Sequence, residues 1–223
     1  MGTTKMTVKV YSPLMADFNR QTAALNLMRD AFLNRMIQCE TPYLAEELRG
    51  KRLSPPARKY IAGSLKRLGT TPVNLVVDQE TADAINKVVK ETNIVRDAFI
   101  NRLILFLRSS KYLMTYLELP EFIAYSDFKT FVEPMPTSPI KAIEDIHRDP
   151  FYYLRTAIQE RHETGLYLVR LPPKLVGFEC FLEDEYVPGT PSYEEEQRKI
   201  EDAFRELEEF ESNALARTEG AAQ

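Results

Sequence analysis

The sequence has no tryptophan, two cysteines and two histidines among its 223 residues. Cys39 and Cys180 are far apart and do not form a Cys-x-x-Cys spacing, so neither a disulfide framework nor a zinc site is predicted. Both are expected to be packing residues in a reducing compartment. The longest apolar stretches, such as residues 100–107, are interrupted by polar residues and are too short to cross a bilayer. Residues 1–9 lack the features of a secretory signal. The expectation is a cytoplasmic protein without a membrane span.

Recognisable catalytic patterns are also missing. The chain has no glycine-rich phosphate loop and no nucleophile motif. His147 and His162 lie near several acidic residues, but no spacing places metal ligands on one helical face, and helix-flanking surface residues explain the same pattern. We therefore expect no enzyme, no cofactor and no metal.

The charge is unevenly distributed. The net charge is −4, yet residues 1–178 carry 25 basic and 19 acidic residues, whereas residues 179–211 carry 13 acidic and 3 basic ones. A basic front and an acidic tail leave a nucleic-acid partner open for the front.

An internal repeat is the most informative feature. Residues 29–37 read RDAFLNRMI and residues 96–104 read RDAFINRLI, identical at seven of nine positions with an offset of 67. Each copy begins with an alternating apolar segment, residues 6–11 and 73–78, which predicts a strand with one buried face.

Helices are expected next, over residues 14–25 and 79–92. Asn26 and Asn93 then interrupt, because asparagine tolerates the left-handed conformation that ends a helix. A second helix follows in each copy, with Phe32 and Phe99 in the core. One strand and two short helices cannot bury their own apolar surface, so two copies are expected to pair their strands antiparallel.

The segment KETNIVRDAFINRLI, residues 90–104, resembles the ribbon-helix-helix (MetJ/Arc-like) superfamily of DNA-binding regulators. The resemblance covers residues 5–37 and 72–106, and the tandem arrangement is similar to that of the conjugation protein TraY. It implies a pseudo-dimer whose two-stranded ribbon enters the major groove of double-stranded DNA. The side chains that alternate away from Val8, Val10, Leu75 and Val77 would then read bases: Thr7, Lys9, Asn74 and Val76.

Phosphates would be held where the second helix of each copy begins, at Leu27 and Arg29 and at Ile94 and Arg96. The alternative for the two arginines is pairing with a neighbouring acid on a solvated helix. Lys51 and Arg52, in the basic stretch between the copies, are candidates for further phosphate contacts, although a solvated linker explains them nearly as well.

The predicted fold is mainly α with short β: a tandem ribbon-helix-helix pseudo-dimer, a small α+β region and a C-terminal acidic helix. Helix is expected over residues 112–123 and 149–162, a proline-rich connector over 134–139, and a hairpin formed by 165–171 and 175–182. The predicted boundaries are 1–38 for the first unit, 39–71 for a basic linker with two short helical pieces, 72–111 for the second unit, 112–190 for the α+β region, 191–217 for the amphipathic acidic helix and 218–223 for a disordered tail.

The expected function is sequence-specific binding of double-stranded DNA, as a transcriptional repressor or as an accessory protein of plasmid or phage DNA transfer or partition. The alternative is an interaction module, antitoxin-like or inhibitor-like, whose acidic helix binds a basic protein partner. Val76 and the net charge favour the alternative, whereas Lys9 and Asn74 favour DNA. Homodimerisation of the chain stays open.

Overall fold

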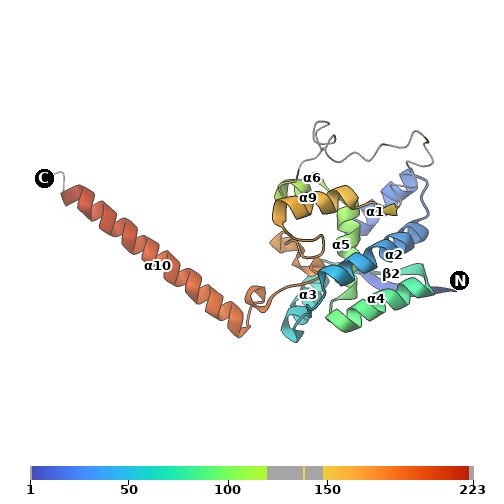
Figure 1. The fold of residues 1–223 in the computed structure, drawn as a ribbon, viewed down its shortest axis with the longest axis horizontal. Coiled ribbons are helices and arrows are strands. Elements are labelled where there is room, and N and C mark those ends of the chain that lie inside the picture. The colour runs from blue at the N-terminus through green and yellow to red at the C-terminus, as the bar shows by residue number, and fades with distance from the viewer. Residues whose placement is uncertain (1, 120–137, 139–147, 221–223) are drawn as a thin grey trace.

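The computed structural model describes residues 2–119, 138 and 148–220 (Figure 1). The first copy of the repeat forms β1 (Thr3–Tyr11), α1 (Ser12–Ala24) and α2 (Arg29–Glu47), and the second forms β2 (Thr70–Asp78), α4 (Gln79–Thr92) and α5 (Arg96–Arg108). Helix α3 (Pro55–Arg67) lies between them in the chain. The second half contains α6 (Lys111–Tyr116), α9 (Tyr152–His162), the 3-10 helices η1 (Pro173–Phe178) and η2 (Asp184–Tyr186), and α10 (Pro191–Gly220). Within this described part the protein is mainly helical with one two-stranded sheet, which confirms the expectation of a mainly α chain with short β.

The two strands form one antiparallel ribbon, with Thr3 opposite Asp78 at one end and Tyr11 opposite Thr70 at the other. Val8, Val10, Leu75 and Val77 are at most 1% exposed, so the alternating pattern correctly predicted which face of each strand is buried.

The turn between the two helices of each copy depends on an asparagine. Asn26 and Asn93 have φ values of 53° and 60°, which confirms the predicted left-handed conformation. The Asn93 N–H donates to the carbonyl oxygen of Val89, which ends α4 and lets the chain turn into α5.

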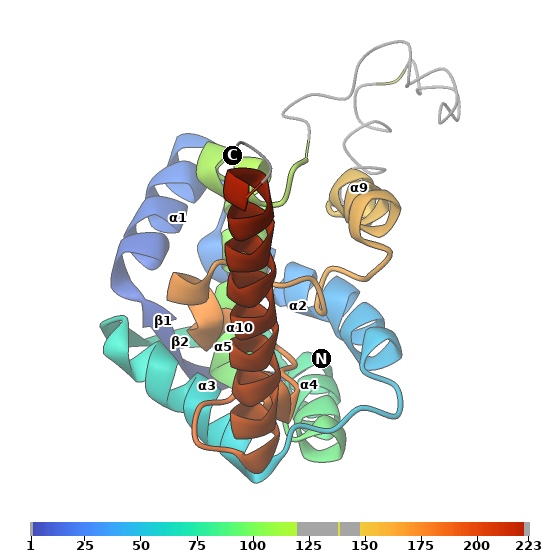
Figure 2. The same cartoon turned by 90° about the vertical axis from the view of Figure 1, so that its left-hand side faces the viewer.

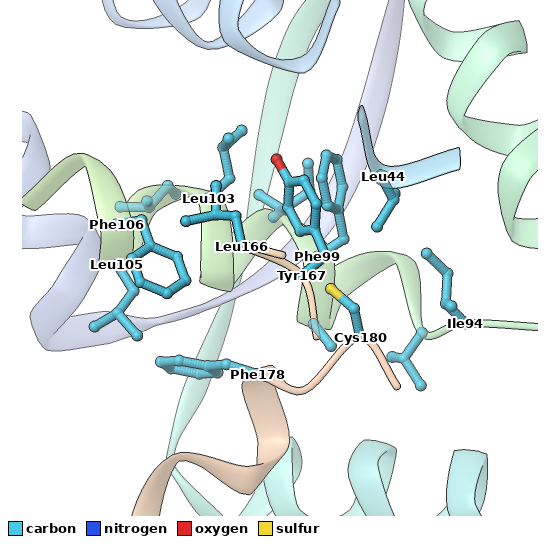
Figure 3. Close-up of a cluster of buried hydrophobic side chains, with 14 of the residues drawn as sticks. Leu44, Ile94, Phe99, Leu103, Leu105, Phe106, Leu166, Tyr167, Phe178 and Cys180 are labelled. Atoms are coloured by element: carbon cyan, nitrogen blue, oxygen red, sulfur yellow. The ribbon is translucent and has the colours of Figure 1, made fainter. Parts of the chain in front are cut away.

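Helix α5 lies at the centre of the core and is surrounded by the other elements (Figure 1). Residues 98–106 of α5 are all buried. Phe99 packs against Tyr167 with ring centroids 5.6 Å apart, and Phe178 adds a second aromatic ring from the later part of the chain (Figure 3). Phe32, which corresponds to Phe99 in the first copy, is only half-buried and stacks on Phe18.

The stretch predicted as a linker, residues 39–71, contains the end of α2 and all of α3. Helix α2 continues to Glu47 with Pro42 inside it, so the first of the two expected helical pieces is part of α2. Helix α3 begins at Pro55 as the proline pair indicated, because Ser54 caps it by accepting a hydrogen bond from the Ala57 N–H at 3.1 Å.

The hairpin predicted over residues 165–171 and 175–182 was wrong. These residues form no strand, and η1 occupies part of the stretch. Side chains of the helices take the place of a ladder partner: the N–H groups of Leu166 and Tyr167 donate to Glu47 at 3.1 and 2.6 Å. The described residues of region 112–190 are therefore helical and irregular, and the α+β prediction for this region is corrected.

Two helical predictions in this region hold in part. Helix α6 ends at Tyr116, short of the expected residue 123, and residues 120–123 lie outside the described residues, as does the proline-rich connector apart from residue 138. Helix α9 follows Asp149, whose Oδ1 accepts a hydrogen bond from the Phe151 N–H at 3.1 Å.

Helix α10 projects from the rest of the chain as a straight rod (Figure 1), and in the turned view it stands in front of the other elements (Figure 2). It extends through Gly220, so residues 218–220, predicted to be disordered, continue the helix, while 221–223 lie outside the described residues. Ile200, Phe204 and Leu207 on this helix are 41%, 62% and 58% exposed.

Candidate nucleic-acid interface

One face of the ribbon is turned to solvent over its central part. Thr7 and Lys9 of β1 and Asn74 and Val76 of β2, the four predicted base-reading residues, are all exposed on this face. Val76 is 42% exposed.

Two further residues extend the outward row, and neither was among the predicted base-reading residues. Lys5 and Pro72 are exposed on the same face, with Lys5 opposite Val76 and Pro72 opposite Lys9. The exposure of Lys5 could have been predicted from the sequence, because Lys5 continues the two-residue alternation of Thr7 and Lys9. It was overlooked because the strand was predicted to begin at residue 6.

The centre of the ribbon lies on an approximate twofold axis. Thr7 and Asn74 are equivalent residues of the two copies, separated by the repeat offset of 67, and they are also direct cross-strand partners. Their side chains are joined, since the Thr7 hydroxyl donates to Asn74 Oδ1 at 2.8 Å. The pairing register and the sequence repeat therefore share one centre.

The repeated motif binds the outer edges of the ribbon, and each copy binds the strand of the other. Arg96 donates to the carbonyl oxygen of Thr7 at 2.8 Å, and Arg29 donates to that of Asn74 at 3.4 Å. Arg29 also donates to the adjacent Asp30 at 2.6 Å, as the alternative interpretation of this arginine required.

The other repeated polar residues act in the same way. The Asp30 carboxylate accepts a hydrogen bond from the Val76 N–H at 3.1 Å, and the Asn34 side chain accepts from the Asp78 N–H at 2.9 Å. In the second copy the Asn101 side chain accepts from the Tyr11 N–H and donates to the Lys9 carbonyl, both at 2.8 Å. Two-stranded ribbons leave both edges unpaired, so this motif satisfies backbone groups that the ribbon itself cannot pair.

Asp97 corresponds to Asp30 and accepts from the backbone N–H of Lys9. Burial raises the pKa of this carboxyl, and the hydrogen bond from Lys9 and the nearby Arg96 partly offset that rise.

The predicted phosphate-binding positions have different surroundings. Helices α2 and α5 begin at Arg29 and Arg96, beside the ribbon edges that these arginines contact. The N–H of Leu27 donates to the Thr22 carbonyl at 2.8 Å, so it is already used inside the protein. The side chain of Ile94 is fully buried. Ala98, in the first turn of α5, donates its N–H to the Val95 carbonyl at 3.0 Å, so the N–H groups of Arg96 and Asp97 are the candidate anion donors there.

Lys51 and Arg52 lie at the C-terminal end of α4. Arg52 donates to the carbonyl oxygens of Lys90 and Glu91 at 3.0 and 2.6 Å, and the Lys51 ammonium lies 5.0 Å from the centre of the Phe181 ring. The Arg52 contacts neutralise the negative end of α4, and the ring contact accounts for Lys51, so both residues are explained without a phosphate.

Two further features of the described residues concern metal ligands and membrane spans. His162 contacts the Leu117 carbonyl through Nε2 at 2.8 Å, while His147 lies outside the described part. Within residues 2–119 and 148–220, no group of three His, Cys, Asp or Glu side chains is arranged to hold a metal ion. None of the helices in these ranges is both long and apolar enough to cross a membrane.

Comparison of the chain with protein-family models, with curated proteins and with solved structures returns no match. The geometry and chemistry of the ribbon are therefore the basis for a functional assignment.

Proposed function

We propose that the chain binds double-stranded DNA as a tandem ribbon-helix-helix pseudo-dimer, inserting its two-stranded ribbon into the major groove. The observation that carries the proposal is the exposed row on the ribbon, in which Lys5, Thr7, Lys9 and Asn74 present polar groups on a face that no element covers within the described residues. A major groove accommodates a two-stranded ribbon, and lysine and asparagine are side chains that read guanine and adenine edges.

The edge contacts support the proposal in a second way. Because Arg29, Arg96, Asp30 and Asn101 bind the ribbon edges, the strands are held rigid without using the outward side chains. Such preorganisation lowers the entropic cost of binding. It also places the start of α5 beside the ribbon, where its N–H groups would meet a phosphate.

The biological role follows from the class of binding. A protein that reads a duplex in this way acts as a transcriptional repressor, or as an accessory protein of plasmid or phage DNA transfer or partition. Occupancy of the DNA upstream of its own coding sequence, with repression there, distinguishes a repressor from a transfer or partition protein.

Titration of the full chain against its own upstream DNA and against random duplex, over a range of salt concentrations, tests the proposal. The variant Thr7→Ala/Lys9→Ala/Asn74→Ala is compared with Lys87→Ala, which removes the same single charge from an exposed position on α4. We expect the triple variant to lose preference for the upstream DNA and Lys87→Ala to retain it. Equal, weak binding of the wild-type protein to both duplexes would refute sequence-specific recognition.

A second candidate function is supported by α10. This helix has 10 acidic and 4 basic residues and carries exposed Ile200, Phe204 and Leu207 on one side. Lys199 and Arg205 are paired with acidic residues of the same helix. The surplus of carboxylates around an apolar stripe suits docking onto a basic groove of a protein partner. In that case the chain would be an antitoxin-like or inhibitor-like interaction module, and the ribbon would be a scaffold that does not discriminate among duplexes.

A further inference from the structure

The two strands of the ribbon carry different chemistry at equivalent positions. The repeat offset relates Lys5 to Pro72 and Lys9 to Val76. Both cations are therefore on β1, and both of their counterparts on β2 are apolar. All four side chains are exposed on the same face.

The register fixes how these side chains are distributed. Lys5 is opposite Val76 at one end of the ribbon, and Lys9 is opposite Pro72 at the other. Each end thus has one lysine and one apolar residue, but the long edge of the face formed by β1 is cationic and the edge formed by β2 is apolar. Rotation about the central Thr7–Asn74 pair exchanges the two edges, so the face has no twofold symmetry although the backbone nearly does.

Proline is tolerated at this place for a structural reason. The N–H groups of Val76 and Asp78 point to the outer edge of β2, where Asp30 and Asn34 accept them. Pro72 lies an even number of residues from Val76, so its backbone nitrogen also faces the outer edge of β2. Its missing N–H therefore removes no hydrogen bond between the two strands. Replacement of Pro72 by another residue is therefore compatible with the ribbon.

The spacing of the two lysines matches the spacing of base pairs. They are four residues apart, roughly 13–14 Å along a strand, which is about four base-pair steps of 3.4 Å. Lysine donates to O6 and N7 of guanine, whereas valine and proline offer only apolar contact, which fits the methyl group of thymine.

From these observations we infer that the ribbon recognises a non-palindromic duplex in one fixed orientation, with guanines about four base pairs apart read by Lys5 and Lys9 of β1, and thymine methyl groups contacted by Pro72 and Val76 of β2. This inference rests on the proposed DNA binding and adds Lys5 as a specificity-determining residue. A homodimer of a single ribbon-helix-helix unit would present the same residues on both edges and could not distinguish the two orientations.

Selection of bound duplexes from a random pool, with the full chain, tests the inference. Wild-type protein is compared with Lys5→Ala and with a symmetrised variant, Pro72→Lys/Val76→Lys, in which both edges are cationic. The matched control is Ala84→Lys/Asn86→Lys, which adds the same two charges at exposed positions on α4. Circular dichroism of each variant verifies that the ribbon and helices are retained.

We expect wild-type sites to be non-palindromic, with two guanines on one strand. Lys5→Ala should reduce the preference for one of these guanines on the order of tenfold and leave the other unchanged. The symmetrised variant should select sites that are palindromic outside the central bases, which still face the unlike side chains of Thr7 and Asn74. The control variant should select the wild-type site with higher affinity. Palindromic wild-type sites, or unchanged guanine preferences in Lys5→Ala, would overturn the inference while leaving DNA binding intact. Failure to enrich any duplex would overturn both.

Discussion

The two copies of the repeat contain the same arginine in opposite surroundings. Arg35 of the first copy is exposed and donates to Gln38 on its own helix at 3.1 Å. Arg102, its equivalent in the second copy, is 0% exposed and donates to the Leu166 carbonyl at 2.9 Å and to Glu179 at 2.8 Å. Identical local sequence therefore gives a solvated side chain in one copy and a buried ion pair in the other.

The difference arises because a later segment of the chain covers α5 on the side where Arg102 lies. Residues 166–182 pack on α5, and Arg102 holds the backbone turns of this segment through Leu166 and Val169. The first copy instead offers acidic groups on α2: Glu40 accepts two hydrogen bonds from Arg155 of α9, each at 2.9 Å. What the copies share is the binding of the ribbon edges, and what separates them is the partner on the opposite side of the second helix.

Arg102→Met should produce the largest contrast between the copies. Removing one partner of a buried ion pair leaves the Glu179 carboxylate uncompensated, and we expect a loss of about 3–5 kcal/mol in the free energy of unfolding. The matched variant Arg35→Met should change it by no more than about 0.5 kcal/mol. Urea denaturation monitored by circular dichroism measures both. Equal losses would mean that the buried pair does not distinguish the copies.

The asparagines of the motif should give a smaller contrast. Asn101 is fully buried and makes three hydrogen bonds, to the Tyr11 N–H and to the carbonyls of Lys9 and Asp97. Its alanine variant leaves buried ribbon groups unpaired, so we expect a loss of about 2–3 kcal/mol. Asn34 is half-buried, and water can replace it, so Asn34→Ala should cost about 1 kcal/mol. Amide hydrogen exchange locates the effect: Asn101→Ala should accelerate exchange at Tyr11, and Asn34→Ala should accelerate it at Asp78. Acceleration at the other residue in either variant would contradict the finding that each copy binds the strand of the other.

The sequence predicted those parts of the fold that depend on local periodicity. Alternation at Val8 and Val10 identified the buried face of β1, and the asparagines identified the turns, because these signals act within a few residues. The edge contacts were not predicted, since Asp30 and Asn101 act on residues 46 and 90 positions away. The repetition of the motif was visible, but it was assigned to helix packing and phosphate binding.

The second half was harder for the same reason. Leu166 to Leu171 is a short, mostly apolar run before the Pro172-Pro173 pair, as a strand could be, yet Glu47, Arg102 and Glu179 bind its backbone groups from three other segments. When distant side chains bind the backbone groups that a partner strand would otherwise bind, the local sequence contains no pattern that predicts it. Lys51 and Arg52 were likewise predicted from composition alone, and their contacts with Phe181 and α4 depend on tertiary structure.

Glu40 provides a comparison that depends on pH. It occupies the position that corresponds to Leu107 in the second copy, and burial raises the pKa of its carboxyl above the usual 4.5, although Arg155 partly opposes the rise. A raised pKa in the folded protein means that the contribution of this group to stability is fully present below the unfolded-state pKa and is lost as the pH rises through the folded-state pKa. Glu40→Gln should therefore make the free energy of unfolding fall less steeply as the pH rises above 4.5. Urea denaturation midpoints of both proteins, measured over a series of pH values, test this. An unchanged pH profile would show that Glu40 does not titrate in this range.

Lys9 and Val76 give the smallest expected effect on stability and the sharpest test of what the copies do differently. Both are exposed at equivalent places on the ribbon, so Lys9→Val, which makes the two copies alike there, should change the free energy of unfolding by no more than about 0.5 kcal/mol. DNA affinity should fall nonetheless, because the remaining valine pair offers no hydrogen-bond donor to a guanine. Lys87→Val is the matched control, since it makes the same change at an exposed position on α4, away from the ribbon. A Lys9→Val protein that unfolds would contradict the exposed position, whereas a stable variant with unchanged affinity would move the recognition surface away from β1.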